Sequence, residues 1–271
     1  MIAPLTQRLL RRGLLGMVML MVGMMLFQFV NPFIADSLGG PEGLESLVEQ
    51  LPPAMQALAQ LSPDFVALTG LAGYLSRGFD HPVFLILLLS AVIGFTGRAI
   101  AGEVDSGILA LALSRPISRL QLYMARVLSL VLIAIVFGLA GPVASRAGLL
   151  VADPAGSVRN GQLLALAALI MLFAWAVGGL SLMVSAMSSS TGRVVSWATG
   201  YLVIAYFVDV FAELWSILEP LRPLSLFAWF DTSATMVDAA VPVDSALVLA
   251  FVGLVGIVVG WLVFRERDFM V

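Results

Sequence analysis

The sequence predicts an all-α membrane protein with six membrane-spanning helices. Of its 271 residues, 61% are hydrophobic and 11% are charged, and the mean hydropathy is +1.04. In soluble proteins roughly a quarter of the residues are charged, so this composition excludes an ordinary soluble fold. Six apolar runs approach the ~20 residues that a helix needs to cross a bilayer. Because these runs and their loops use the whole chain, we treat residues 1–271 as a single transmembrane domain.

The distribution of arginine predicts that both termini are cytoplasmic. All fourteen basic residues are arginine, and six spans place ten of them on the side that holds the termini. Cytoplasmic loops of membrane proteins carry the excess of basic residues. An arrangement with five or seven spans would scatter the arginines on both sides, so the bias favours six. Cysteine is absent, which excludes disulfides and thiolate metal sites.

The first span is expected at residues 13–30, because this run is longer than the apolar core of a signal peptide. Asn31 and Pro32 should end the helix. The acidic, proline-rich stretch 31–81 then predicts an outer loop. Its apolar pattern is interrupted between residues 44 and 74, which favours short helices at the outer interface.

The remaining spans follow from the same apolar pattern. Pro142 should end the third span, and Arg126 near its start can extend its side chain to the membrane surface. Small residues in the fourth span suit close helix packing. Residues 212–245 predict an outer re-entrant or interfacial region, whose aromatic side chains suit a membrane-interface belt. Spans two to six are expected at residues 82–97, 120–143, 163–187, 194–211 and 246–264.

A basic segment, residues 98–119, connects the second and third spans on the expected cytoplasmic side. Its centre has the apolar face of a helix that is too short to cross a bilayer. Pro116 disfavours helical backbone at the residue before it, so the helix should end there. Ser118 can then cap the third span. The pattern predicts a short helix along the cytoplasmic surface, formed around Ile108, Leu109 and Leu111.

Four motifs occur in order along the chain. The basic segment contains EVDSGIL followed by SRPISR, the fourth span ends in SLMVSAMSSSTGR, LRPLSLFAWFD precedes the last span, and FRERDF closes it. With the six spans and the long first outer loop, these motifs resemble the permeases of type-2 ABC exporters over nearly the whole chain. In LRPLSLFAWFD, Leu226 stands where that family usually has proline.

The resemblance implies a permease that dimerises and binds two separate ATPase subunits on its cytoplasmic face. It implies a transporter in the plasma membrane of a bacterium or archaeon that exports a hydrophobic or amphipathic compound. The chain has no GxxxxGK[ST] phosphate loop, so ATP and Mg²⁺ would be bound by the partner. The chain itself would hold no cofactor or metal and no catalytic site, and no nucleic acid partner is expected. The resemblance assigns ATPase coupling to Glu103, Gly107, Ile108, Leu109, Leu111, Arg115, Pro116 and Arg119. It assigns a cytoplasmic contact near the C-terminus to Arg267 and Asp268.

Individual residues also have simpler interpretations. In a permease, Glu103 and Arg115 would fix the register of the coupling segment on the ATPase by charge. Alternatively, Glu103 is a solvated acid and Arg119 contacts lipid headgroups. His81 is the one histidine of the chain and is expected to be a helix cap or loop contact, because a metal site needs more ligands.

Three other classes of membrane protein are alternatives. An ion-gradient-driven secondary transporter typically carries ionisable residues at mid-membrane and internal repeats, and the sequence indicates neither. A membrane enzyme would need clustered polar residues within the spans, and the sequence of the predicted spans has no such cluster. A non-transporting membrane scaffold for an ATPase would use the same basic segment as a permease, so the sequence does not separate these two.

Overall fold

The computed structural model describes residues 2–11, 13–50, 52, 63–109, 117–212 and 215–268. In this part of the chain the regular structure is helical throughout. Six helices are long and apolar enough to cross a membrane, which confirms the prediction of an all-α, multi-pass membrane protein. They are α2 (Leu14–Ser37), α6 (Pro82–Ala99), α9 (Arg119–Ala152), α10 (Asn160–Met187), α11 (Thr191–Ala212) and α13 (Val243–Glu266).

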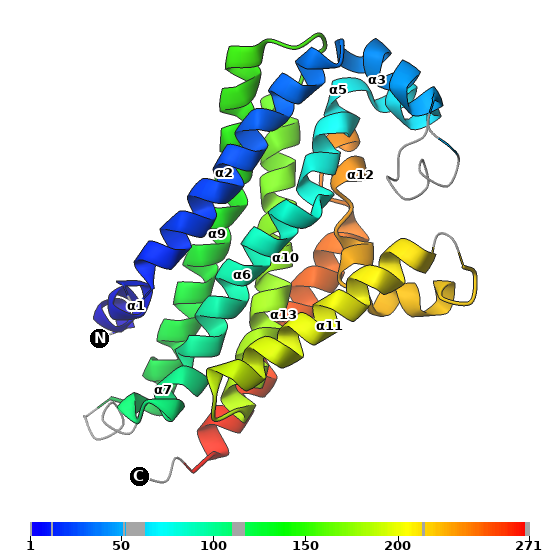
Figure 1. Ribbon diagram of the computed structural model, residues 1–271. Coiled ribbons are helices and arrows are strands. Elements are labelled where there is room, and N and C mark those ends of the chain that lie inside the picture. Colours follow the sequence, from blue (N-terminus) through cyan, green and yellow to red (C-terminus); the bar gives the residue numbers. More distant parts are fainter. Residues whose placement is uncertain are drawn as a thin grey trace.

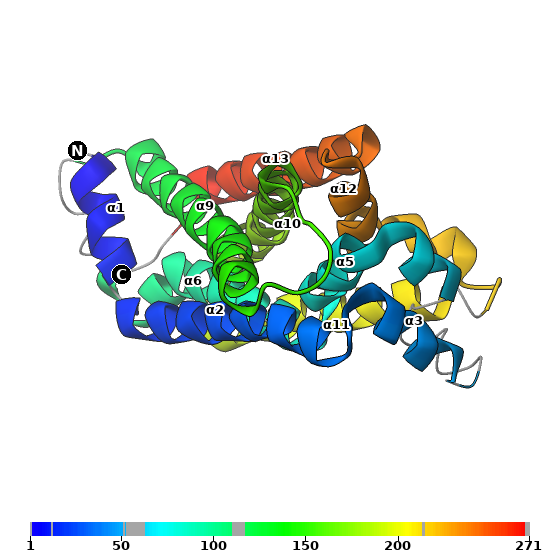
Figure 2. The ribbon, with the colours of Figure 1, turned by 90° about the horizontal axis from the view of Figure 1, so that it is seen from above.

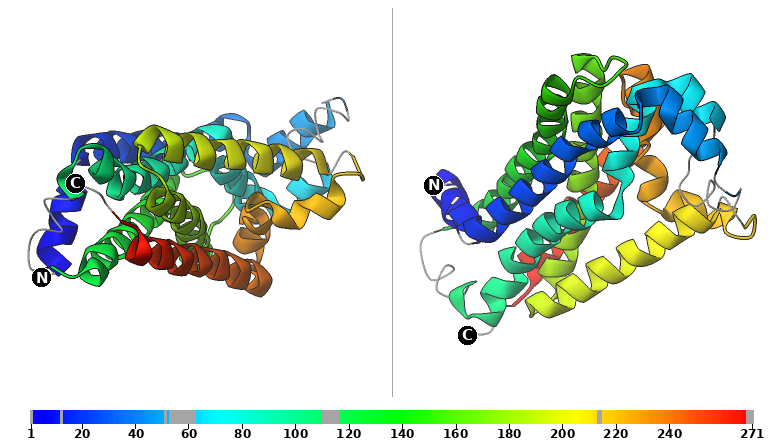
Figure 3. Two further views of the ribbon diagram at one scale, coloured as in Figure 1. Left: turned by 90° about the horizontal axis from the view of Figure 1, so that it is seen from below. Right: turned by 45° about the horizontal axis from the view of Figure 1, so that its top comes forward.

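The six long helices form two layers. α2, α6 and α11 lie side by side in one layer and α9, α10 and α13 in the other, as seen from above and below (Figures 2 and 3). α10 packs against α9 and α13 and also contacts α6 across the layers. Successive long helices run in alternating directions, so both termini lie at one end of the bundle, beside α1 (Ile2–Arg11) (Figure 1). We call this the terminal end and the opposite one the distal end.

α10 is the central helix of the bundle. In its most apolar stretch 61% of the residues are buried, against 17% in α2 and 22% in α11. Gly179 of α10 faces Gly253 and Gly256 of α13 so closely that a Cβ at position 179 would overlap the α13 backbone. Gly178 makes the same kind of room for Leu130 of α9. These contacts confirm that the small residues of the fourth span serve helix packing.

Two spans continue past the prolines that were expected to end them. α2 continues through Pro32 to Ser37, and α9 continues through Pro142 to Ala152. Each proline removes one backbone hydrogen bond, but uncoiling the helix in apolar surroundings would leave several more groups unpaired. The added turns also pack together, because Gly148 of α9 brings its backbone against Pro32 of α2. The expectation that these prolines end their helices was wrong.

The first outer segment contains short helices, as predicted, but one of them is packed into the bundle. α3 spans Gly40–Glu49, and α5 spans Pro63–Asp80 with a kink at Gly70. Apolar residues that recur every four positions along α5 are buried in the core; they are Leu71, Leu75 and Phe79. α5 therefore runs down into the bundle toward α6 (Figure 1), whereas the sequence predicted a helix resting on the surface.

The described residues between α11 and α13 fold back onto the distal half of the bundle. Phe227 and Phe230 are buried, and their ring centres lie 5.3 and 4.4 Å from that of Phe173 in α10. These two aromatic residues therefore fill the core instead of forming the interfacial belt that the sequence predicted. The elements of this region are η1 (Glu219–Leu224), η2 (Phe227–Trp229) and α12 (Thr232–Asp238).

Candidate functional site

The basic segment starts with a short helix at the terminal end. α6 ends at Ala99, and after the non-helical residue Ile100 the chain forms α7 (Ala101–Asp105). Figure 1 shows α7 at the same end of the bundle as both termini. Ser118 caps the next helix, accepting from the N–H of Gln121 at 3.2 Å, as the sequence predicted.

Arg126 of α9 is the centre of a polar network at this end. Its side chain is buried, although it lies two turns into an apolar helix. Nη2 of Arg126 donates to Oε2 of Glu103 on α7. Its Nε donates to the carbonyl of Ala99 at 2.5 Å and its Nη1 to that of Leu122 at 2.6 Å. The expectation that Arg126 extends to the membrane surface was wrong, because these groups supply its partners within the protein.

Two further arginines connect the ends of helices. Arg119, the first residue of α9, donates from Nη1 to the carbonyl oxygens of Arg265 (2.7 Å) and Arg267 (2.8 Å) at the end of α13. Arg267 donates in turn to the carbonyl oxygens of Ala186 (2.6 Å) and Ser188 (2.8 Å) at the end of α10. Cations at helix C-termini satisfy the last carbonyl groups and complement the helix dipole. These bonds tie α9, α10 and α13 together.

Two hydroxyl groups join α10 and α11 to the junction between α6 and α7. Ser185 of α10 accepts from the backbone N–H of Ala101 at 3.0 Å. Thr191 of α11 donates to the carbonyl of Gly97 at 3.5 Å. A Cβ at Gly102 would lie 2.8 Å from the Thr191 hydroxyl, so α7 and α11 pass very close to each other. α7 is thereby held by three neighbouring spans.

Tyr123 adds an aromatic layer around the ion pair. Its hydroxyl donates to the carbonyl of Ile257 in α13 at 2.8 Å. Its ring centre lies 5.6 Å from Trp261 and 5.7 Å from Phe264. The guanidinium of Arg126 lies 5.8 Å from the centre of the Phe264 ring, within cation–π distance. This apolar surrounding strengthens the ion pair but makes the loss of either partner costly.

The network contains three of the residues that the resemblance implied. Glu103 pairs with Arg126 inside the chain and is not a solvated surface acid. Arg119 binds the end of α13, and Arg267 binds the end of α10. The neighbouring Asp268 is exposed.

The other residues assigned to coupling lie beyond α7. Gly107 has a φ of 68°, a conformation that favours glycine and turns the chain away from α7. Ile108 is partly exposed, whereas Leu109 is buried in the core. Leu111, Arg115 and Pro116 lie outside the described residues.

Sequence reasoning missed Arg126 and Tyr123 as part of this site. The signal was present in their spacing, because Arg119, Tyr123 and Arg126 lie at positions i, i+4 and i+7 and share one face of α9. An arginine within an apolar span also indicates a buried partner. Pairing across the loop with Glu103 depends on the tertiary fold.

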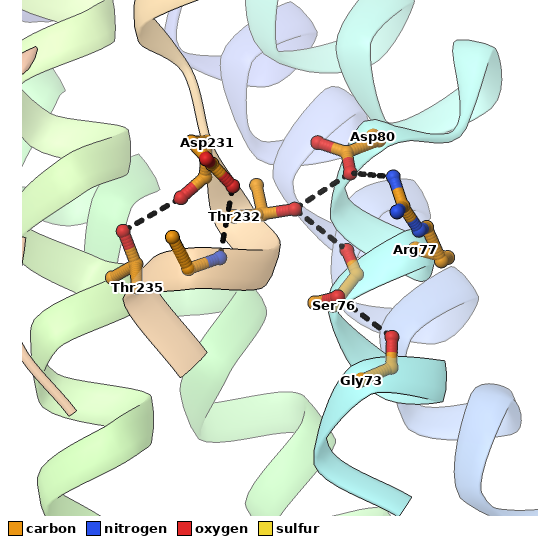
Figure 4. A network of polar contacts seen from close by, with 8 residues as sticks. Gly73, Ser76, Arg77, Asp80, Asp231, Thr232 and Thr235 are labelled. Carbon is orange, nitrogen blue, oxygen red and sulfur yellow. Dashed lines mark hydrogen bonds and ion pairs between the residues drawn. The ribbon is translucent and has the colours of Figure 1, made fainter. Parts of the chain in front are cut away.

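A second polar network lies at the distal end, between α5 and α12 (Figure 4). Thr232 of α12 donates to the carboxylate of Asp80 at 2.6 Å and to the carbonyl of Ser76 at 3.3 Å. Arg77 lies 3.6 Å from the same carboxylate. Asp231 caps the start of α12 with its side chain. These bonds join the helix before α6 to the helix before α13.

The pKa of Asp80 is raised to about 7, chiefly by burial and to a smaller extent by the nearby carboxylates of Asp231 and Asp209. The hydrogen bond from Thr232 and the positive charge of Arg77 act in the opposite direction. Asp80 is the last residue of α5 and lies outside the spanning helices. Its protonation therefore changes near neutral pH.

The distal network faces a cavity of about 890 Å³. On the side of this cavity toward the terminal end, an apolar groove of about 400 Å³ runs between α6 and α11. Four residues line both spaces: Pro82, Leu85, Tyr206 and Phe227. The cavity and the groove are therefore adjacent.

His81 lies at the edge of this cavity and caps α6, as predicted. Its Nδ1 accepts from the N–H of Val83 at 3.2 Å, and its ring lies 5.0 Å from that of Phe27. Among the described residues, no group of three or more His, Cys, Asp or Glu is arranged to hold a metal ion.

Residues 65–270 match the family described as "Protein of unknown function (DUF2705)". The chain belongs to this family. The match covers about three quarters of the chain, from α5 to α13, so both polar networks of this DUF2705 protein lie within it. No curated protein matches the chain. The DUF2705 description assigns no activity.

Proposed function

We propose that this DUF2705 protein is the membrane-spanning permease subunit of an ATP-binding cassette transporter. Two copies of the chain and two separate ATPase subunits form the transporter, which exports a hydrophobic or amphipathic compound across the plasma membrane of a bacterium or archaeon. The ATPase binds ATP and Mg²⁺ and hydrolyses the nucleotide. This chain transmits the resulting movement to the membrane and has no catalytic role.

The attachment of α7 to the long helices is the observation that carries the proposal. α7 lies at the end of the bundle, where a partner outside the membrane reaches it (Figure 1). The bond from Arg126 to Glu103 connects α7 to α9, and the bond from Ala101 to Ser185 connects it to α10. Because these bonds join α7 to α9 and α10, in addition to its chain connection to α6, a displacement of α7 moves several spans together.

The distribution of arginine supports a cytoplasmic terminal end. Excess basic residues mark the cytoplasmic side of a membrane protein. Of the arginines in the described part of the chain, eight belong to the terminal end and four to the distal end. The eight are Arg8, Arg11, Arg98, Arg119, Arg126, Arg193, Arg265 and Arg267; the four are Arg77, Arg146, Arg159 and Arg222.

The outward surfaces of α2 and α11 support a dimer. These two helices have the least buried apolar stretches of the six. α11 also exposes large side chains along its length, including Trp197, Ile204 and Phe207. In the proposal, this face of α11 and the groove beside α6 meet the same surfaces of a second copy. The apolar lining of the groove suits a hydrophobic or amphipathic substrate.

Co-purification with the ABC ATPase encoded beside this protein tests the proposal. The wild-type chain in lipid should retain the ATPase and change its rate of ATP hydrolysis. Glu103→Ala combined with Arg115→Ala should lose binding or stimulation. Because Glu103 also supports the fold, Asp105→Arg on the exposed side of α7 tests docking without breaking the ion pair. Asp153→Ala, in the exposed distal loop, is the control and should behave as wild type.

The alternatives predict different results. If no ATPase co-purifies, or if the α7 variants behave as wild type, the permease proposal fails and a gradient-driven transporter becomes the better interpretation. If the ATPase binds but no compound is transported in proteoliposomes, the chain acts as a membrane scaffold for the ATPase.

A further inference from the structure

We propose that the distal cavity and the adjoining groove form one binding site for a cationic amphipath, a positively charged organic group attached to an apolar tail. This inference rests on the proposed function in one respect, because it names the ligand class of the groove that the proposal gives to the substrate. Its evidence comes from residues of this chain, and its test needs no ATPase. The inference rests on the lining residues that the cavity and the groove share, the charges that line the cavity and the apolar lining of the groove.

The cavity and the groove are adjacent but differ in chemistry. The cavity of about 890 Å³ is lined by α5, α6, α11, α12 and the two 3-10 turns. Its charged residues come from α5, α11, η1, α12 and the residue that caps α12. The groove of about 400 Å³ is lined almost entirely by carbon, from residues such as Ile86, Leu89 and Val203. Tyr206 and Phe227 line both parts and mark the boundary between them. A ligand that fills both needs a polar end and an apolar end.

The charges around the cavity favour a positive headgroup. Six titratable groups line it besides Asp80 and Tyr206; they are Arg77, His81, Asp209, Arg222, Asp231 and Asp238. Arg77 lies 3.6 Å from Asp80, and Arg222 lies 3.1 Å from Asp209, so each guanidinium is matched by a carboxylate. Asp231 and Asp238 are carboxylates in excess of these pairs. Among the described residues the lining therefore carries a net negative charge that a cation complements.

Repulsion among the carboxylates supports the same conclusion. Asp231 and Asp209 lie close enough to Asp80 to oppose its ionisation. A cation in the cavity would relieve this repulsion and favour the ionised form of Asp80. By linkage, binding of the cation should strengthen as the pH rises through the neutral range.

The experiment measures binding of decyltrimethylammonium to the purified full chain in phosphatidylcholine nanodiscs, with empty nanodiscs as background and no ATPase present. Decanol and decyl sulfate carry similar tails with neutral and anionic heads. The proposal expects saturable binding of the cation, at least tenfold tighter than that of either comparison compound, and tighter at pH 8 than at pH 6.

Substitutions in the cavity and in the groove test separately how each part contributes to binding. Asp80→Asn keeps an acceptor for Thr232 and should weaken cation binding at pH 8 by about tenfold while flattening the pH dependence. Asp238→Asn at the exposed end of α12 provides a second variant with little effect on folding, and it should weaken binding several-fold. Ser90→Trp should block the groove and weaken binding of all tailed compounds. The controls are Asp153→Asn in the distal loop and Val136→Trp on the exposed face of α9.

Three outcomes would overturn the proposal. The first is binding that does not saturate above empty nanodiscs. The second is equal affinity for the three headgroups, which would indicate partition into the apolar groove alone. The third is equal affinity of the cavity variants and their controls. Because no ATPase is present in this assay, its failure leaves the coupling proposal to its own test, and the converse also holds.

Discussion

Arg126 of α9 and Glu103 of α7 form an ion pair inside the terminal end of the bundle, with side chains that are 2% and 12% exposed. Burying two charges costs desolvation energy, which the pair regains only with good geometry and additional hydrogen bonds. The carbonyl groups of Ala99 and Leu122 supply those bonds. The pair therefore fixes the position of α7 on the bundle, which is what transmission of a movement from α7 requires.

Breaking this pair should destabilise the protein more than removing both charges. Arg126→Gln or Glu103→Gln leaves one buried charge without its counterion, and each should cost about 3–5 kcal/mol of unfolding free energy. The double variant Arg126→Gln with Glu103→Gln leaves no unpaired charge and should cost less than either single variant. Unfolding in mixed micelles measures all three. Additive losses would show that the two side chains do not interact.

Arg119 should hold the last turn of α13. Arg119→Lys keeps the charge but loses the planar guanidinium that reaches the carbonyl groups of Phe264, Arg265 and Arg267. We expect amide hydrogens at the end of α13 to exchange several-fold faster in this variant, measured by hydrogen–deuterium exchange in lipid. Arg193→Lys, at an exposed position of α11, is the control. Unchanged exchange at the end of α13 in Arg119→Lys would contradict the contact.

The close crossing of α10 and α13 should tolerate no added side chain. A methyl group at Gly179 would overlap the backbone of α13 at Gly253, so Gly179→Ala should cost at least about 1–3 kcal/mol or prevent folding. Gly200 of α11 has open space around it, and Gly200→Ala should be neutral or stabilise the helix by about 0.5–1 kcal/mol. The yield of monodisperse protein and its unfolding temperature measure both. Similar behaviour of the two variants would contradict the close contact at this crossing.

Asp80 should make stability depend on pH between about 4 and 7. Its pKa of about 7 lies above the ordinary value of 3.8, so the folded protein holds the proton more tightly than the unfolded chain. The resulting stabilisation is complete below pH 3.8, falls by at most about 1.4 kcal/mol per pH unit as the pH rises, and is lost above about pH 7. Asp80→Asn should remove this slope. Unfolding free energies at pH 5, 6, 7 and 8 test this, and parallel curves for wild type and variant would contradict it.

The six long helices could be predicted from the sequence because each is a long run of apolar residues. The ends of two helices could not, because Pro32 and Pro142 normally end helices and here are retained by packing between α2 and α9. α5 was predicted to rest on the surface, since its interrupted apolar pattern does not reveal that one face is buried against the bundle. Local pattern therefore predicted where helices form, but not how far they continue or what covers them.

The candidate site could be predicted only in part, for the same reason. The basic segment indicated Glu103 and Arg119, but the partners of both residues are distant in the sequence. The distal cavity draws its lining from α5, α6, α11 and α12, and no local motif contains these residues together. A site that is assembled by tertiary contacts of this kind cannot be predicted until the fold is known.

Site-specific crosslinking tests the central claim, that α7 is the contact for an ATPase. The chain contains no cysteine, so a single introduced cysteine is a unique attachment point. Asp105→Cys places it on the exposed side of α7, and Asp153→Cys places it at the opposite end of the bundle. After co-expression with the neighbouring ABC ATPase, a short bifunctional reagent should join the ATPase to the cysteine at position 105, to an extent that changes with bound nucleotide, and leave position 153 unlinked. Linking at neither position, or equally at both, would contradict the claim.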